Sequence, residues 1–179
     1  MDYYQKKFYL AQINRDDQLI SPIERWRAHQ EGILHRGFTV VLVYQRQFIL
    51  QHRKHPAFDG FFDLSFSSHP IYVKNQLQSM EEAIYDTLKR EWNLSKKDLK
   101  TDLKYLDKFH YKARDPYSVY TEHEVDYLYS VEITRLPQPI LEFSYGYDLL
   151  KISSRFNRDQ ISSFQLAPWI KKINLSKLL

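Results

Sequence analysis

The sequence predicts one domain of mixed α/β class (α+β), in which strands and helices alternate along residues 1–179. Short runs in which apolar and polar residues alternate, such as residues 61–66, are typical of half-buried strands. Capping motifs at Ser21 and Ser79 indicate helix starts between such runs. A length of 179 residues suits one domain with an ample core.

The expected strands cover residues 8–13, 38–44, 47–52, 61–68, 103–112 and 120–131, with an edge strand at 142–143. The link Gln45-Arg46 predicts a hairpin between the second and third of them. Near the end of the chain, a short helix is expected at residues 147–153 and a last helical stretch from Asn157 onward.

Two helices are expected earlier in the chain. Residues 21–24 predict the start of a short helix that ends near His29, because serine suits the cap, proline the first turn and Glu24 the capping-box position. The clearest helix begins after Ser79, and its apolar stripe consists of Met80, Ile84 and Leu88. Three residues further, the stripe reaches Glu91. A carboxylate on a buried face is costly unless it is paired or coordinates a cation, and the alternative is a helix end that reaches solvent.

Composition excludes several classes of function. There are no cysteines, which rules out disulfides and thiolate metal sites, and four glycines are too few for a phosphate-binding glycine loop. No apolar run is long enough to span a membrane, so a cytoplasmic protein is expected. The net charge of +4 is scattered, which disfavours nucleic-acid binding and suits an anionic small molecule. The oligomeric state stays open.

Histidines and glutamates at strand ends are candidate metal ligands. His69 ends a strand and could be a ligand or proton carrier, although a surface histidine before a turn is the simpler account. Glu122 and Glu124 project from one strand face, where they repel unless a cation lies between them; an ordinary exposed face is equally open. His29 and His35 share no helix or strand face, and they converge only if the chain turns between them.

Basic and aromatic residues are candidates for a substrate pocket. Arg53, Lys54 and His55 follow a strand end and could hold a diphosphate, although a solvated loop explains them more simply. Trp169 stands beside a proline and could wall a pocket, although plain core packing is the commoner role of such a residue.

Together these features form one known pattern. The order of His29, His35, Ser-Ser-His-Pro, a helix ending in glutamate, Glu-x-Glu and Pro-Trp resembles type I isopentenyl-diphosphate isomerase of the Nudix superfamily. The resemblance runs from about residue 8 to Trp169. Its most specific parts are Ile49-Leu50-Gln51-His52-Arg53, Ser67-Ser68-His69-Pro70, Tyr111-Lys112-Ala113-Arg114-Asp115-Pro116 and Glu122-His123-Glu124-Val125.

The resemblance implies an α/β/α sandwich with a mixed sheet and a divalent metal, whether manganese, zinc or magnesium. The positions that match the family's metal ligands are His29, His35, His69, Glu122 and Glu124. Glu91 matches the carboxylate that meets a second cation, usually magnesium, bound with the diphosphate of the substrate. Tyr111 and Trp169 match aromatic pocket residues, and Glu124 also handles protons. The positions that match diphosphate-binding residues are Arg25 and Arg53, with Lys54 or His55 filling another.

The implied chemistry adds a proton to one face of a double bond and removes one from the other. A tertiary carbocation forms in between, and a tryptophan face can stabilise it in a dry site. The chain departs from the pattern at Ser67, which occupies the position of the family's catalytic cysteine. The pKa of a free thiol is about 8.5. The pKa of an aliphatic hydroxyl is close to that of water, roughly 15.7, so a serine is a much poorer base than a cysteine. Three further departures are Leu64 for asparagine, Thr87 for arginine and Asn93 for glycine, and the loop at residues 71–78 is longer.

Two other functions are open. A Nudix hydrolase binds magnesium on several carboxylates of one helix, but here the matching positions hold Ser68 for a glycine and Gln78, Thr87 and Arg90 for glutamates. Only Glu91 remains, so the usual hydrolase site is disfavoured and a divergent hydrolase of another diphosphate is the second hypothesis. The third is a non-catalytic protein that binds metal and a prenyl diphosphate, because the ligands are kept and the thiol is lost.

Overall fold

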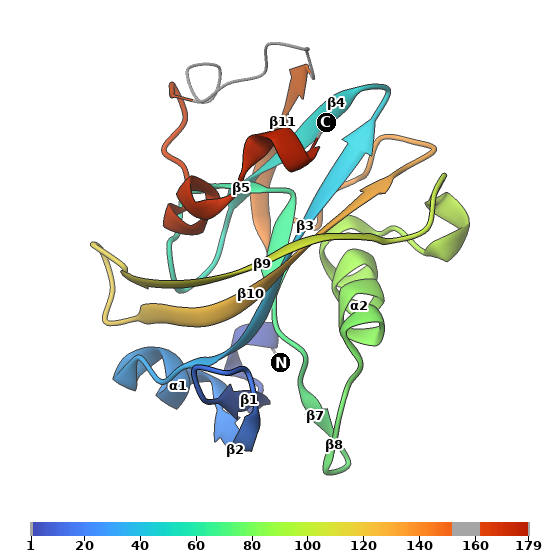
Figure 1. The fold of residues 1–179 in the computed structure, drawn as a ribbon. Helices are drawn as coiled ribbons and strands as arrows, with labels where there is room; N and C mark the ends of the chain where they lie inside the picture. Colours follow the sequence, from blue (N-terminus) through green and yellow to red (C-terminus); the bar gives the residue numbers. More distant parts are fainter. Residues whose placement is uncertain (1, 152–161, 179) are drawn as a thin grey trace.

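The computed structural model describes residues 2–151 and 162–178, and a mixed sheet forms its centre (Figure 1). Its main path runs β11-β4-β3-β1-β2. These strands are Ser144–Lys151, Gln47–Arg53, His35–Tyr44, Tyr9–Ile13 and Leu19–Glu24. β10 (Thr121–Glu132) pairs with β3 in parallel and with β9 (Lys104–Arg114) antiparallel, which makes the sheet mixed. β5 (Phe62–Leu64) joins β4, and β6 (Phe66–Ser68) joins β3.

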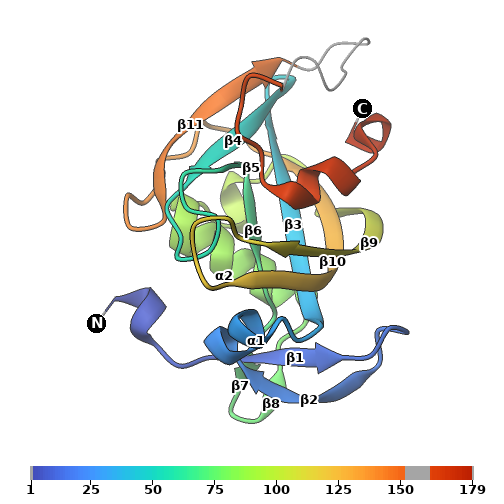
Figure 2. The same ribbon diagram turned by 90° about the vertical axis from the view of Figure 1, so that its left-hand side faces the viewer.

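The helices and the last described turns cover the two faces of this sheet (Figure 2). The α-helices are α1 (Arg25–Glu31) and α2 (Met80–Trp92). Short 3-10 helices are formed by Tyr3–Gln5, Lys96–Asp98, Pro168–Lys172 and Leu175–Leu178. A two-stranded hairpin, β7 (Tyr72–Val73) with β8 (Gln76–Leu77), lies in the loop before α2. None of the helices in the described part of the chain is both long and apolar enough to cross a membrane.

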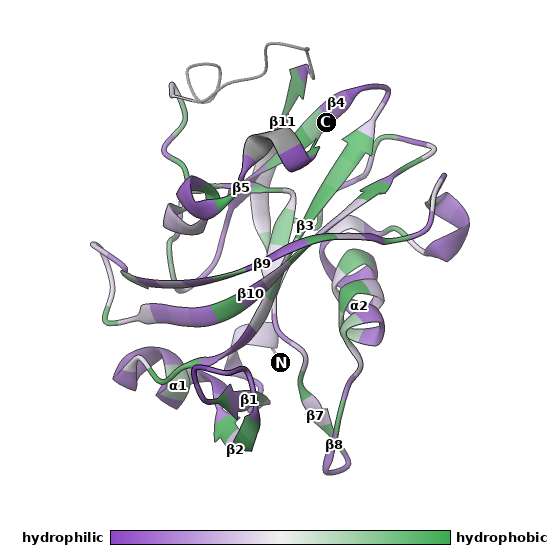
Figure 3. Cartoon of the chain, in the orientation of Figure 1, coloured by the Kyte–Doolittle hydropathy of each residue, from purple (hydrophilic) through white to green (hydrophobic). Residues whose placement is uncertain are grey.

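The apolar stripe of α2 packs on one face of the sheet. Ala83, Ile84, Leu88 and Trp92 are buried against a set of sheet residues, namely Phe38, Val40, Leu42, Ile49 and Phe66. Burial of an aliphatic side chain of this size stabilises the fold by about 1.5–3 kcal/mol. Figure 3 shows β3 as a largely hydrophobic strand, as expected of a strand covered on both faces.

The opposite face is covered by the 3-10 helix Pro168–Lys172. Trp169 and Ile170 are buried there with Val41, Phe48 and Leu50 from the sheet. Tyr111 of β9 belongs to the same cluster. A residue near the end of the chain is thereby held beside the central strands.

The structure contains the short helix that was expected from Ser21 to near His29, but residues 21–24 are not part of it. These residues belong to β2, and the helix begins at Arg25 with Glu24 as its N-cap, whose side chain accepts a hydrogen bond from Arg27 N. Proline is tolerated in β2 because this strand lies at the edge of the sheet, and Pro22 opposes Ala11 in β1.

The predictions for residues 142–153 are also wrong as far as the structure describes them. The edge strand begins at Ser144 and continues to Lys151, so residues 147–151 pair with β4 instead of forming a helix. Residues 152–153 and the expected helix start at Asn157 lie outside the described residues.

The expected strand at residues 61–68 is divided. Ser65 has a φ of +65°, and the strand changes partner there from β4 to β3. Ser65 Oγ donates to Ile49 O at 2.8 Å and accepts from Leu42 N at 2.7 Å, which holds the bend. This bend directs the second half of the segment toward the site. The other expected strands and the helix after Ser79 are confirmed within a few residues.

Candidate metal centre and its cavity

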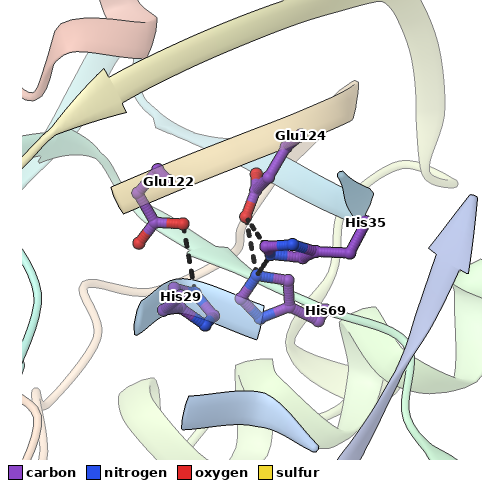
Figure 4. A group of neighbouring side chains, drawn as sticks. All are labelled: His29, His35, His69, Glu122 and Glu124. Atoms are coloured by element: carbon purple, nitrogen blue, oxygen red, sulfur yellow. Dashed lines mark hydrogen bonds and ion pairs between the residues drawn. The ribbon is translucent and has the colours of Figure 1, made fainter. Parts of the chain in front are cut away.

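Five histidine and glutamate side chains from four parts of the chain meet at one point (Figure 4). His29 comes from α1, His35 from the start of β3, His69 from the end of β6, and Glu122 and Glu124 from β10. One ligand atom from each lies within 4.8 Å of the others. The parallel register opposes Glu124 to His35, and left-handed Gly32 (φ +60°) turns the chain between α1 and β3.

Backbone carbonyls orient two of the histidine rings. His29 Nδ1 lies 2.7 Å from Arg25 O, and His35 Nδ1 lies 2.7 Å from Ile33 O. A carbonyl only accepts, so each Nδ1 carries the proton and each Nε2 presents a lone pair. This is the tautomer that metal-binding histidines commonly have.

Two of the atoms at the centre have no hydrogen-bond partner within the described residues, and the others contact only one another. His29 Nε2 and Glu122 Oε2 are 3.1 Å apart, yet neither makes a hydrogen bond with the described residues. The Nε2 atoms of His35 and His69 face each other at 3.2 Å. Glu124 Oε1 lies 2.6 Å from the same atom of His69 and 3.3 Å from that of His35. Buried lone pairs converging on a point fit a divalent cation, and this N/O set suits a transition metal better than calcium.

The histidines and glutamates of this cluster shift one another's pKa values. Burial favours the neutral form of Glu124, but His69 and His35, when their Nε2 atoms are protonated, outweigh it and hold the pKa of Glu124 well below its ordinary value. Burial likewise opposes a charge on His29, and Glu122 outweighs it and raises the pKa of His29. Burial, with Glu124 beside it, raises the pKa of Tyr111 well above its ordinary value. The tyrosine is therefore a neutral donor, and its hydroxyl donates to Glu124 Oε2 at 2.9 Å.

Gly37 makes room for this glutamate. A Cβ atom at Gly37 would stand 2.2 Å from Glu124 Oε2 and 2.6 Å from its Cδ. Real Cβ atoms essentially never come closer than 3.0 Å to a neighbour, so any other residue would displace the carboxylate. The glycine is required here by a close approach of a side chain, because its φ is not positive.

The metal cluster opens onto a cavity lined by most of the predicted site residues. They are Arg25, His29, Arg53, His55, Ser67, His69, Glu91, Tyr111, Glu122, Glu124 and Trp169. His35 lies behind the wall and is fully buried. The structure thus brings together residues separated by as many as 144 positions in the chain, from Arg25 to Trp169.

The aromatic wall is fixed by ion pairs and hydrogen bonds. Trp169 Nε1 donates to Asp63 Oδ1 at 2.9 Å, and its ring lies 5.7 Å from that of Tyr111. The second carboxylate oxygen of Asp63 pairs with Arg53 Nη1 at 2.9 Å, and the Arg53 guanidinium lies 5.0 Å from the Trp169 ring centroid. Asp63 was not predicted from the sequence; its polar place in an alternating strand was the only signal.

The comparisons with known proteins agree with this geometry. No protein-family profile matches the chain. Human isopentenyl-diphosphate delta-isomerase 2 is 26% identical over 184 residues, which cover 92% of this chain and 79% of that protein. Isopentenyl-diphosphate Delta-isomerase of Serratia proteamaculans is 25% identical over 141 residues, which cover 77% and 73%. The resemblance expected from the sequence is confirmed.

Solved structures with a similar fold include a Deinococcus radiodurans protein, with a TM-score of 0.68, 16% identity and coverage of 92% of this chain and 95% of that one. The NUDIX domain of Shewanella oneidensis NrtR, complexed with ADP ribose, has a TM-score of 0.55 and 15% identity and covers 81% and 86%. The chain has the Nudix fold. The predicted fold class is confirmed.

Within this Nudix fold, Ser67 takes part in a line of hydrogen bonds. Its Oγ lies 2.8 Å from Thr39 Oγ1, and Thr39 donates to Asp126 Oδ2 at 2.8 Å. Thr39 has a single hydroxyl proton, so Ser67 is the donor to Thr39 and keeps its lone pairs for other partners. Thr39 and Asp126 were not predicted, although Asp126 continues the strand face of Glu122 and Glu124 and could have been found by that period.

The basic residues that line the cavity differ in their surroundings. Arg25 is buried, and its Nη2 donates to three carbonyls of the N-terminal turn, those of Tyr3, Tyr4 and Lys6. No carboxylate within the described residues pairs with it. A buried, unpaired guanidinium is costly, so this charge favours an anion in the cavity.

Of the two alternatives after Arg53, the structure brings only His55 to the cavity. Lys54 Nζ donates to Leu141 O at 3.0 Å, beside the Tyr145 ring, and Lys54 does not line the cavity. Burial, and then Arg53, hold the pKa of His55 well below its ordinary value, so His55 presents a neutral ring.

Glu91 and the residues around it form the far wall. Glu91 is only 8% exposed, lines the cavity, accepts from Gln51 Nε2 at 3.2 Å and pairs with Arg90 Nη2 at 2.9 Å. Tyr3 and Tyr4, which the sequence analysis missed, line the same cavity from the N-terminal turn. Two adjacent tyrosines in a polar segment were the only sequence signal for them.

The remaining departures from the isomerase pattern have separate structural settings. Leu64 is fully buried in the core and does not line the cavity. Asn93 caps α2 in the left-handed conformation (φ +51°), a role that asparagine fills after glycine. Thr87 is buried one turn before Arg90. The Nudix hydrolase positions Gln78, Thr87 and Arg90 supply no carboxylate to Glu91.

Proposed function

We propose that the protein interconverts isopentenyl diphosphate and dimethylallyl diphosphate, with metal-dependent protonation and deprotonation. The observation that carries this proposal is the five-ligand cluster beside Tyr111 and Trp169 in a cavity with buried guanidinium groups. The two isomerase relatives at 26% and 25% identity support the same reaction class. The proposal extends to a single Nudix-like domain over residues 1–179 and a cytoplasmic location.

In this proposal a divalent metal, whether manganese, zinc or magnesium, is held by His29, His35, His69, Glu122 and Glu124. Such a cation would neutralise the buried carboxylates and fix the position of Glu124. Glu91 would hold magnesium together with the diphosphate of the substrate. Carboxylate oxygens and substrate phosphates are the ligands that magnesium usually takes.

The aromatic and acidic side chains would divide the proton chemistry. Glu124, to which the Tyr111 hydroxyl donates a hydrogen bond, would give a proton to the substrate carbon or take one from it. The Trp169 ring, held by Asp63, would stabilise the carbocation, a contact that contributes about 2 kcal/mol when it is desolvated. Arg25, Arg53 and His55 would hold the diphosphate end.

Ser67 would act opposite Glu124, where a thiol is expected in the resembling family. Because its proton is directed to Thr39, the lone pairs of Ser67 Oγ are free to accept a hydrogen bond. A hydroxyl is a far weaker base than a thiolate, so we expect slow turnover. General acid–base catalysis by one group is worth about a hundred- to ten-thousand-fold. Ser67→Cys should therefore raise isomerisation by about tenfold or more, while Ser67→Ala should not.

The deciding experiment incubates the metal-loaded protein with isopentenyl diphosphate and measures both dimethylallyl diphosphate and released phosphate. Isomer without phosphate supports the proposal. Phosphate release from this or another diphosphate, without isomer, would instead identify a divergent Nudix hydrolase. Failure of both the parent and Ser67→Cys to isomerise would refute the isomerase.

A non-catalytic protein that binds metal and a prenyl diphosphate is the second candidate. The observation that favours it is Ser67 itself, whose hydroxyl already serves a structural hydrogen bond to Thr39. This candidate predicts tight binding of the diphosphate with no turnover by either the parent or Ser67→Cys.

A further inference from the structure

Arg90 carries a largely buried guanidinium on the wall of the cavity, and the function proposed above gives it no task. It stands near the C-terminal end of α2, and 20% of its side chain is exposed. Its Nη2 donates to Glu91 Oε1 at 2.9 Å, to Thr87 Oγ1 at 3.0 Å and to Ser68 Oγ at 3.3 Å. Three acceptors thus compete for a nitrogen that carries two hydrogens.

Another donor of the same guanidinium is left over. Arg90 Nε is buried and has no hydrogen-bond partner among the described residues. The ring of Tyr3 covers the guanidinium, with the Cζ atom 4.4 Å from the ring centroid, and holds it in place. A fixed, buried N–H without an acceptor is costly, and a ligand oxygen would remove that cost.

Thr87 explains how Arg90 reaches this position. Side chains on a helix lean toward its N-terminus, so Arg90 extends back across the residue one turn earlier. Thr87 Oγ1 donates to Ala83 O at 2.9 Å and accepts from Arg90, which makes it a support for the guanidinium.

We propose that Arg90 is a substrate-binding residue that holds a phosphate group of the diphosphate beside Ser68 Oγ. The charge absent at Thr87 is thereby supplied from the next turn of the helix. A guanidinium fork matches phosphate oxygens, and occupation of Glu91 by a cation would free the Nη2 donor for them. The inference rests on the proposed function only in its ligand class, a diphosphate.

The test measures binding of inorganic pyrophosphate with magnesium by calorimetry, using the metal-loaded protein. Arg90→Gln should weaken binding by roughly tenfold to a hundredfold, the range for losing a charge-assisted hydrogen bond. The pyrophosphate affinity of Arg90→Lys should lie between those of the parent and Arg90→Gln, because lysine keeps the charge but lacks the forked guanidinium. The control is Lys89→Gln, which removes the same charge from an exposed neighbour on α2 and should change binding by less than about twofold.

A second variant separates binding from a structural role. Thr87→Arg combined with Arg90→Gln returns a guanidinium to the helix one turn earlier and should recover a good part of the lost affinity. The metal content of the His/Glu cluster should stay at the parent value in Arg90→Gln. Equal binding by Arg90→Gln and Lys89→Gln, or loss of the first metal in Arg90→Gln, would overturn the inference.

The outcome for the proposed function is read separately. If the parent binds pyrophosphate through Arg90 yet does not isomerise isopentenyl diphosphate, the isomerase fails and the Arg90 assignment stands. If the parent isomerises while Arg90→Gln leaves both pyrophosphate affinity and KM unchanged, only the Arg90 assignment fails. A parent that binds no pyrophosphate refutes the assignment outright.

Discussion

Gly37→Ala tests the candidate metal centre through a residue outside its set of candidate ligands. The new Cβ atom would stand 2.2 Å from Glu124 Oε2, and that separation must grow to at least 3.0 Å. The carboxylate must then shift, which disturbs its 2.6 Å contact with His69 Nε2 and the 2.9 Å hydrogen bond that it accepts from Tyr111. Disturbing the setting of a metal ligand typically costs 10- to 100-fold in metal affinity, or about 1.4–2.8 kcal/mol.

The assay is a metal titration followed by calorimetry, with the melting temperature of the metal-loaded protein measured alongside. The control is Gly60→Ala, where a Cβ atom meets nothing within 4 Å but the φ of +73° imposes backbone strain. It should lower stability by about 1 kcal/mol and leave metal affinity unchanged. Adding Glu124→Asp to Gly37→Ala shortens the crowded side chain and should recover stability. If Gly37→Ala binds metal as tightly as the parent, the proposed role of Glu124 as a ligand is wrong.

The other predictions use single substitutions. His69→Ala should abolish stoichiometric metal binding, because the ring contributes an Nε2 at the centre of the cluster; elemental analysis of the purified protein checks it, and a full metal content would refute it. Glu91→Gln should weaken magnesium-dependent diphosphate binding while the first metal stays, and loss of both would mean that the two sites are one. Leu88→Ala should lower the free energy of unfolding by about 2–5 kcal/mol in urea denaturation, since Leu88 is 1% exposed against the sheet; a change below about 1 kcal/mol would show that the helix packs loosely.

Residues whose position follows from local periodicity were predictable from the sequence. Glu122 and Glu124 are two residues apart and therefore share one face of a strand, and Glu91 continues the apolar stripe of α2. All three side chains are buried and line the cavity, as this periodicity predicts. The convergence of His29 and His35 depended on a turn between them. The left-handed cap at Gly32 supplies it, and a glycine at that point was a visible signal.

Contacts made by long side chains and by changes of strand partner were not predictable in the same way. The position of the Arg90 guanidinium depends on its hydrogen bond to Thr87 and on its contact with the Tyr3 ring, which comes from the N-terminal turn. The first helix was expected to start at residues 21–24 but starts at Arg25, because the Ser-Pro pattern of a helix start also suits an edge strand. In both cases the decision lies in tertiary neighbours that a sequence window does not contain.

The proline in β2 has a consequence for how copies of this protein meet. Arg25 N donates to Phe8 O, so alternation makes the pair of Pro22 with Ala11 a non-hydrogen-bonded one, and the Pro22 nitrogen faces outward. Leu19 and Ile20 are exposed beside it, at 52% and 58%. A strand from a second molecule could pack against these apolar side chains. At Pro22, however, it would face the proline ring and would lack the backbone N–H that a hydrogen bond between the strands requires. Pro22 thereby guards this edge against extension of the sheet between molecules, the route by which open edges lead to aggregation.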